Sequence, residues 1–402
     1  MLTLQPAPRP QHPSRPRVAL ALAGGGPLGA FYELGALQAL EECVEELDLT
    51  ALDTYVGVSS GALIAASLAN GLTPADMGLV FIDNASAEYP LSPWLFLQPA
   101  FGEYAHRLSR APRMIASLAR QYLSAPRAGA WAAAAEPLGQ LLPTGIFDNR
   151  PFERYLRKVF TVDGRSNDFR TLARRLYVIA TDLDGGSEAC FGAPGFDAVP
   201  ISTAIQASTA LPGLYPPVRI GGRTYVDGAL LRTMHASVAL ERQATLVLCV
   251  NPLVPYDAYA SPAPHHDLTR GGLPLVLSQT FRSLIRSRMQ IGMKGYRASY
   301  PHADMLLFEP DRSDQAMFFV NIFKYSGRRR LVDHCYARTR ADLALHAQAL
   351  VPLLARHGLR LNREVLAETG RTFKQAMQRR RHRFGHATSR LQATLDRLQG
   401  LL

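Results

Sequence analysis

The sequence predicts an α/β protein with a central, mostly parallel sheet, helices on both faces and a helical C-terminal extension. Residues 18–23, 54–58 and 176–182 are short, continuous apolar runs, which are typical of strands buried on both faces. The first two runs each lead through a glycine-containing turn into a helical pattern, as in strand–helix units of parallel sheets. With 402 residues, 47% of them hydrophobic, the chain can bury a sizeable core.

The first predicted strand runs directly into a glycine-rich segment, residues 24–29, and a helix is expected from about 30 to 47. Successive glycines leave backbone N–H groups open at the positive end of a helix. Pro27 has no N–H and suits the first helical turn, so Gly25 and Gly26 are the expected free donors. The loop therefore predicts a cradle for a negatively charged oxygen.

Two anions suit such a cradle. Gly24, Gly26 and Gly29 match the spacing of a dinucleotide-binding fingerprint, which also needs an acidic residue near the end of the next strand. That strand leads into Ser59 instead, so the sequence favours the oxyanion formed when a serine attacks an ester. A purely structural loop remains the alternative. No cofactor is expected.

Ser59 follows the second predicted strand within Gly-x-Ser-x-Gly, where the glycines are Gly57 and Gly61. This pattern is typical of a tight strand-to-helix turn that presents a serine oxygen at the edge of a sheet. Ordinary turns use the same residue types, so the pattern alone leaves both interpretations open.

Asp227 ends a further predicted strand, which begins near residue 222, and is followed by Gly228 and Ala229. Asp-Gly is by itself a common turn. A proline-rich segment, residues 207–218, precedes this strand and is expected to form an ordered loop. The remaining expected elements are helices near 103–123, 151–159, 201–208 and 273–300 and strands near 189–191 and 305–308.

Together, the glycine loop, the serine motif and the Asp-Gly-Ala motif resemble the patatin-like phospholipase family, whose motifs occur in this order. The similarity spans roughly residues 18–252. It implies a three-layer α/β/α fold and a serine lipid acyl hydrolase of the phospholipase A or lysophospholipase type. The implied substrate is a phospholipid or another acyl-ester lipid.

The resemblance also assigns roles. Ser59 would be the nucleophile, Asp227 its partner in a Ser-Asp dyad that forms an acyl-enzyme, and Gly228 and Ala229 the remainder of the aspartate motif. No metal is implied. The oxyanion hole would be formed by Gly24, Gly25, Gly26 and Gly29, and the nucleophile turn by Gly57 and Gly61.

One residue departs from the family pattern. The family usually has Arg or Lys just before the last glycine of the loop, whereas this chain has Leu28. The backbone donors do not depend on that side chain. The change leaves the preference for phospholipid over neutral ester open.

The domain organisation expected from these patterns has three parts. Residues 1–16 form a flexible tail, residues 17–310 a catalytic domain with a helical insertion at about 74–144, and residues 311–402 a basic helical extension.

Two alternatives remain. In a neutral lipase or esterase with a Ser-His-Asp triad, His235, His302 or His334 would be the base. The early position of the nucleophile, after only the second predicted strand, argues against that order. In the other alternative, the chain is a basic membrane- or nucleic-acid-binding protein with vestigial hydrolase motifs.

Charge and composition bear on partners and location. The net charge of +11 indicates an anionic partner, and the basic cluster at 379–383, with leucines at 391, 395, 398 and 402, suits peripheral contact with an anionic membrane. Nucleic acid is not expected, and the oligomeric state is open. Four dispersed cysteines and the absence of an apolar leader or membrane-spanning run predict a cytoplasmic protein.

Overall fold

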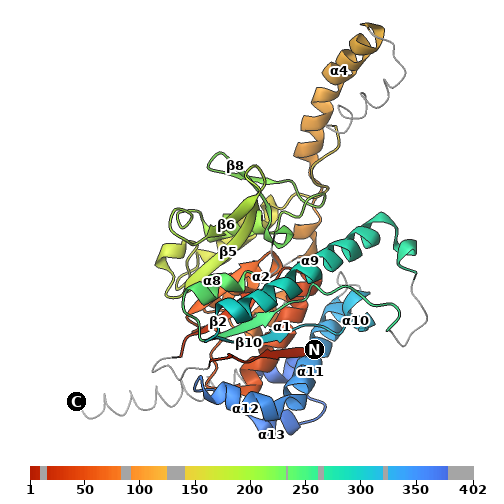
Figure 1. The fold of residues 1–402 in the computed structure, drawn as a ribbon. Helices are drawn as coiled ribbons and strands as arrows, with labels where there is room; N and C mark the ends of the chain where they lie inside the picture. The colour runs from red at the N-terminus through yellow and green to blue at the C-terminus, as the bar shows by residue number, and fades with distance from the viewer. Residues whose placement is uncertain are drawn as a thin grey trace, which may run out of the picture.

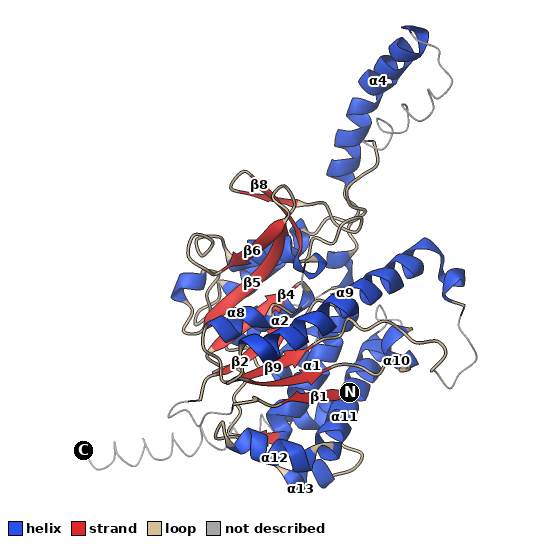
Figure 2. Cartoon of the chain, viewed as in Figure 1, coloured by secondary structure: helices blue, strands red, loops and turns tan. Residues whose placement is uncertain are grey.

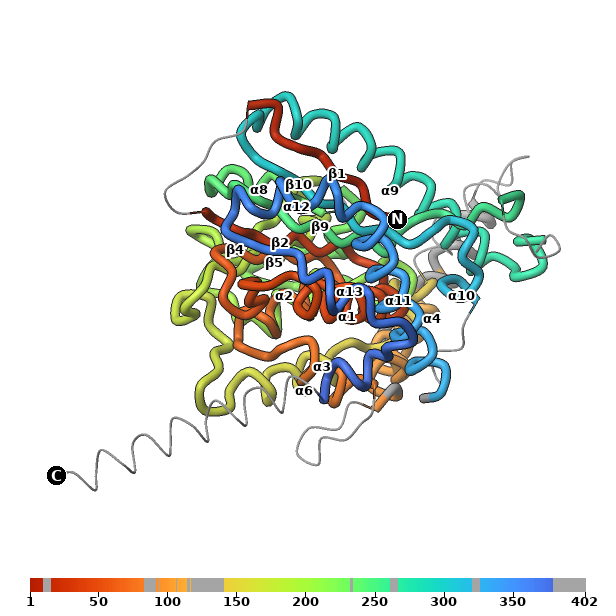
Figure 3. Tube along the Cα trace, turned by 90° about the horizontal axis from the view of Figure 1, so that it is seen from below, coloured from red at the N-terminus to blue at the C-terminus, as the bar shows by residue number. Residues whose placement is uncertain are grey.

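The computed structural model describes residues 1–9, 16–82, 92–124, 141–231, 234–260, 267–319 and 325–378. Within these ranges a mixed sheet is sandwiched between two layers of helices (Figures 1 and 2). Figure 3 shows α9 and α8 on one side of the strands and α1, α2 and α6 on the other. The predicted three-layer α/β fold with a mostly parallel sheet is therefore confirmed.

The sheet has the strand order β1-β10-β9-β2-β4-β5-β8-β7, and β6 pairs with β5. Neighbouring strands from β10 to β5 along this order are parallel, whereas β1, β6, β7 and β8 pair antiparallel. The strands are β1 (Leu2–Gln5), β2 (Val18–Leu22), β4 (Thr54–Val58), β5 (Arg175–Asp182), β6 (Ser187–Phe191), β7 (Val218–Ile220), β8 (Arg223–Asp227), β9 (Leu246–Val250) and β10 (Asp304–Phe308). A second, small sheet pairs β3 (Val44–Glu45) with β11 (Arg360–Leu361).

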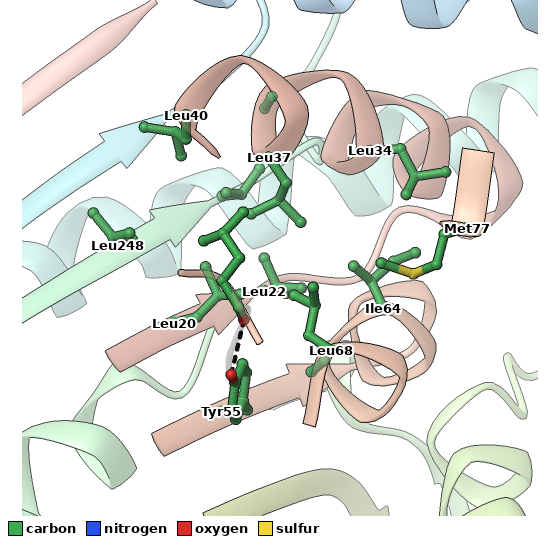
Figure 4. Close-up of a cluster of buried hydrophobic side chains, with 14 of the residues drawn as sticks. Leu20, Leu22, Leu34, Leu37, Leu40, Tyr55, Ile64, Leu68, Met77 and Leu248 are labelled. Atoms are coloured by element: carbon green, nitrogen blue, oxygen red, sulfur yellow. Dashed lines mark hydrogen bonds between the residues drawn. The ribbon is translucent and has the colours of Figure 1, made fainter. Parts of the chain in front are cut away.

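Helices cover both faces of the sheet because successive strand residues point to opposite faces and the side chains on both faces are apolar. Leu20 and Leu22 of β2 pack into one core, while Ala19 and Ala21 face the other. Figure 4 shows the first core, which is formed largely by leucines. The helices are α1 (Gly26–Cys43), α2 (Ser60–Ala69), α3 (Pro74–Phe81), α4 (Phe101–Ser124), α6 (Arg150–Phe160), α7 (Ile201–Ser208), α8 (Ala236–Glu241), α9 (Gly272–Ser299), α10 (Gln315–Phe318), α11 (Tyr325–Leu345), α12 (Ala347–Ala355) and α13 (Arg363–Ala367).

The first helix differs from its predicted bounds. It begins at Gly26 rather than near residue 30, because the Gly29 N–H already donates to the Gly25 carbonyl at 3.0 Å. It ends at Cys43, where the chain leaves the helix to form β3. The second part of the glycine segment, residues 26–29, is thus the N-terminal turn of α1, and Gly24 and Gly25 precede it.

The prediction of a flexible tail over residues 1–16 is wrong for its first part. Residues 2–5 form β1, which pairs antiparallel with β10 at the edge of the sheet. Leu2 is buried, and the Ala7 N–H donates to the Asp304 carboxylate at 2.7 Å. Local composition does not reveal these partners, which lie about 300 residues away in sequence.

The C-terminal helices complete the core and do not form a separate appendage. Helix α11 packs lengthwise on α1, where the backbone of Gly35 meets Cys335 and Tyr336. Residues of α12 and α13 also contribute to this core, among them Leu350 and Val365. The predicted basic cluster at 379–383 and the leucines beyond it lie outside the described residues.

The predicted insertion at 74–144 also differs in its beginning. Met77 and Phe81 of α3 are buried in the main core, so α3 belongs to the body of the domain. Helix α4 contains Pro112 and projects away from that body (Figure 1). We therefore propose that the insertion begins after α3.

The contact between α1 and α11 can be tested by Gly35→Ala. A Cβ at Gly35 would lie 2.8 Å from the Cys335 Cβ and 2.9 Å from backbone atoms of Val332 and Tyr336. The substitution should lower the free energy of unfolding by about 1–3 kcal/mol in urea denaturation, despite the higher helix propensity of alanine. Gly295→Ala in α9 is the matched control, because its Cβ would meet open space. Equal effects of both substitutions would contradict this packing.

Candidate active site

The glycine loop and Ser59 lie side by side because they follow neighbouring parallel strands. Strands β2 and β4 pair in parallel, with Leu22 opposite Gly57, so the segments that follow them leave the sheet at the same end of the strands. A Cβ placed on Gly24 would come within 2.8 Å of the Ser59 Cβ and 3.6 Å of its Oγ. The bare main chain of the loop therefore contacts the serine directly.

Ser59 occupies a sharp turn between β4 and α2. Its φ of 52° and ψ of −122° are unusual for a residue with a side chain and indicate local strain. The turn also requires close backbone approach, since a Cβ at Gly57 would lie 2.5 Å from the Ala62 Cα and one at Gly61 2.6 Å from the Ala23 oxygen. Ser59 is only 7% exposed. The local geometry is that of the predicted nucleophile turn.

Asp227 reaches the same site from the antiparallel part of the sheet. It ends β8, where it pairs with Ala180 of β5, and its side chain is buried. The Ser59 hydroxyl interacts with the carboxylate and favours its ionised form, and the Ala229 N–H donates to Oδ1 at 2.9 Å. Gly228 allows this turn, because a Cβ there would lie 2.3 Å from the Ile179 oxygen. The structure thus brings together the serine and the acid of the two predicted motifs.

Burial dominates the electrostatics of Asp227. It raises the pKa of Asp227 to about 6, although the hydrogen bonds from Ala229 and Ser59 favour the ionised form and oppose that shift. A carboxyl group with this pKa is mostly ionised near neutral pH and can exchange a proton with its surroundings. It therefore has the properties of a general base.

The sequence analysis missed the residues that hold this pair in position. The Ser208 hydroxyl accepts from the Ser59 N–H at 2.8 Å and donates to the Ile179 carbonyl at 2.5 Å. The Asp227 N–H donates to the Ala210 carbonyl at 3.0 Å, and the Thr181 hydroxyl to the Asp227 carbonyl at 3.0 Å. Ser208 lies in the proline-rich segment that the sequence singled out, but its partners come from distant strands.

The glycine loop offers three of the four donors that the family resemblance implies. Among the described residues, no hydrogen-bond acceptor is found for the N–H groups of Gly24, Gly25 or Gly26. The Gly29 N–H, by contrast, is occupied within α1, so Gly29 is not a free donor. Its role is close packing, because a Cβ there would lie 2.9 Å from Pro252 Cγ.

The histidines required by a triad have other partners. His235 Nδ1 is 3.0 Å from Glu188, His334 Nε2 is 2.6 Å from Asp314, and the His302 ring contacts the Arg9 carbonyl. In the ranges that the structure describes, no histidine forms a hydrogen bond or ion pair with Ser59 or Asp227.

Two further features of the described chain concern metals and membranes. No group of three or more His, Cys, Asp or Glu side chains within the described ranges is arranged to hold a metal ion. No helix in the same part of the chain is long and apolar enough to cross a bilayer.

The comparison with known protein families matches the part of the chain that contains these site residues. The model of the patatin-like phospholipase family matches residues 20–240, which is more than half of the chain. The chain belongs to the patatin-like phospholipase family. The matched range contains the glycine loop, Ser59 and Asp227.

The curated relatives and solved structures that are similar to this chain are distant. Uncharacterised NTE-family proteins of Mycobacterium bovis and Mycobacterium tuberculosis are 24% identical over 234 residues, which cover 58% of this chain and 30% of theirs. The chain thus spans less than a third of the length of those relatives.

Two solved structures are similar at low scores. VipD from Legionella pneumophila is 17% identical, covers 83% of this chain and 67% of its own, and has a TM-score of 0.38. The type III effector ExoU of Pseudomonas aeruginosa is 18% identical, with coverages of 85% and 65% and a TM-score of 0.29. The family assignment depends on the family-model match.

The raised pKa of Asp227 has a consequence for stability. Because its folded pKa lies above the unfolded value of about 3.9, the ionised carboxylate destabilises the fold above pH 6, and this cost disappears as the pH falls through 6 towards 4. Asp227→Asn should therefore raise the free energy of unfolding by about 1–3 kcal/mol at pH 8, with no gain below about pH 4.

Urea denaturation across this pH range measures the effect. Ser59→Ala is the control, because it keeps the buried carboxylate. It should lose stability with rising pH as the wild type does, and slightly more so, since the Ser59 hydroxyl favours the ionised form. An Asp227→Asn variant that is less stable than the wild type at every pH would contradict the burial of a charged group at this position.

Proposed function

We propose that this protein hydrolyses carboxylic ester bonds of phospholipids by a Ser59–Asp227 dyad. The single observation that carries the proposal is the placement of the Ser59 hydroxyl beside the buried Asp227 carboxylate, against a glycine backbone with open N–H groups. A serine hydroxyl needs a base within hydrogen-bond reach to act as a nucleophile, and Asp227 is that base.

In the first step, Ser59 Oγ attacks the carbonyl carbon of the ester while Asp227 accepts the hydroxyl proton. The carbonyl oxygen becomes an oxyanion, which the N–H groups of Gly24, Gly25 and Gly26 stabilise. Each such donor is worth roughly 3 kcal/mol in the transition state. The tetrahedral intermediate then collapses, the bond to the leaving oxygen breaks, and Asp227 returns the proton to the departing alcohol. An acyl-enzyme remains on Ser59.

In the second step, water attacks the acyl carbon and gives its proton to Asp227. The oxyanion forms again in the glycine loop, and its collapse releases the fatty acid. Asp227 then returns the proton to Ser59 Oγ. This cycle needs neither a histidine nor a cofactor, and a general base contributes roughly 10²–10⁴-fold to the rate.

The phospholipase A or lysophospholipase subtype and the preference for phospholipid are the finer part of the proposal. Leu28 is half-buried and packs against the core, where the family usually has a basic residue. The net charge of +11 supports an anionic lipid substrate all the same. We place the catalytic unit in a domain that includes the helices of residues 325–378.

A mass-spectrometric product screen on a mixed phospholipid and triacylglycerol extract tests the proposal. The wild type should release fatty acid and lysophospholipid, whereas Ser59→Ala and Asp227→Asn should each lose activity by about 10³-fold or more. Substitution of His235, His302 or His334 by alanine should leave the rate within about threefold of wild type.

Three results would overturn parts of this proposal. Identical product profiles for wild type and Ser59→Ala would contradict serine hydrolysis altogether. A loss at one histidine as large as that at Ser59 would replace the dyad with a triad. Release of fatty acid from triacylglycerol alone would restrict the activity to neutral esters.

A further inference from the structure

Helix α9 is a long helix that the body of the domain holds along one side only. Of its 28 residues, only Ile285 and Met289 are buried. The inward face makes specific contacts with the chain: Gln279 exchanges hydrogen bonds with the backbone of Tyr256, and Arg282 donates to the Val254 carbonyl. These contacts fix which face of α9 points away from the protein.

The outward face of α9 is apolar, contrary to the usual pattern of a surface helix. Five large side chains, each three, four or seven residues from the next, lie on this face and are between 39% and 71% exposed. We call them the outer stripe: Leu273, Leu277, Phe281, Leu284 and Ile291. The stripe extends about 27 Å along the helix axis. Scattered exposed leucines are ordinary, but an aligned row of this length is an interaction surface.

The charges around the outer stripe have one sign. Helix α9 has no acidic residue, and apart from Arg282 on its inward face its cations are the half-buried Arg286 and the exposed Arg288, Lys294 and Arg297. A second copy of this chain would bring the same cations together, which is unfavourable. A nucleic acid would meet the cations but would leave the apolar stripe exposed to water. An anionic lipid surface satisfies both, since acyl chains accept the stripe and headgroups accept the cations.

The position of α9 connects this surface to the candidate active site. Arg288 donates to the Leu230 carbonyl at 2.7 Å, three residues after Asp227. Helix α9 donates hydrogen bonds to the backbone of residues 252–256. This segment begins with Pro252, which lies against Gly25 and Gly29 of the glycine loop. Figures 1 and 2 show the N-terminal end of α9 reaching past the body of the domain.

We propose that the outer stripe of α9 docks this protein on the surface of an anionic lipid bilayer. The docking itself stands on the shape and charge of α9. Its purpose, which is to deliver lipid to Ser59, rests on the proposed function.

Vesicle binding tests the docking apart from catalysis. The protein carries Ser59→Ala so that the lipid stays intact, and the vesicles contain phosphatidylcholine with or without about 30% phosphatidylglycerol. The parent should co-float with the anionic vesicles and bind the neutral ones far less. Adding Leu277→Gln and Leu284→Gln should lower the bound fraction by about tenfold.

The matched control introduces the same change at exposed leucines outside α9. Leu183→Gln with Leu345→Gln alters side chains that are 52% and 78% exposed and should bind like the parent. In the enzyme that retains Ser59, the pair Leu277→Gln and Leu284→Gln should slow hydrolysis of vesicle lipid. The same pair should leave kcat/KM for a water-soluble short-chain ester within about twofold of the wild-type value. That split separates docking from catalysis.

Four results would overturn the proposal: no binding of the parent to anionic vesicles, equal binding of the stripe variant and the parent, equal binding to neutral and anionic vesicles, or dissociation by the stripe substitutions of a stable dimer seen in sedimentation velocity. If the wild type does not hydrolyse the soluble ester, that result would overturn the proposed function but not the docking.

Discussion

The site depends on one buried interaction, between the Ser59 hydroxyl and the Asp227 carboxylate. This contact requires three segments to lie together near the carboxyl ends of the parallel strands. They are the turn after β4, the end of β8 and the glycine loop after β2. Parallel pairing of β2, β4 and β5 brings those strand ends together. The local cost is visible in the positive φ of Ser59 and in the raised pKa of Asp227, and the surrounding core holds both in place.

The parts of this account that could be predicted from sequence are local. The strands at 18–22, 54–58 and 175–182 are continuous apolar runs, and Ser59 and Asp227 follow directly from strand ends marked by glycine. The motif order then identified the family. These features are encoded within a few residues of each other, so short-range patterns suffice.

The parts that could not be predicted depend on contacts between distant residues. In the sequence, Ser208 is an ordinary serine at the end of a helix. Its role appears only in the fold, where its hydroxyl accepts from the Ser59 N–H and donates to the Ile179 carbonyl of β5. Strand β1 needs the edge of β10, and the packing of α11 on α1 needs the space left by Gly35. The outer stripe of α9 can be seen as exposed only once the inward face of that helix is known.

The central claim is that Asp227 activates Ser59, and covalent labelling with a fluorophosphonate tests it most directly. The account predicts that peptide mass spectrometry finds the adduct on Ser59. The labelling rate should rise with pH, with a midpoint near 6. It should fall by about 10²-fold or more in Asp227→Asn. An adduct on another residue, or undiminished labelling of Ser59 in Asp227→Asn, would contradict it.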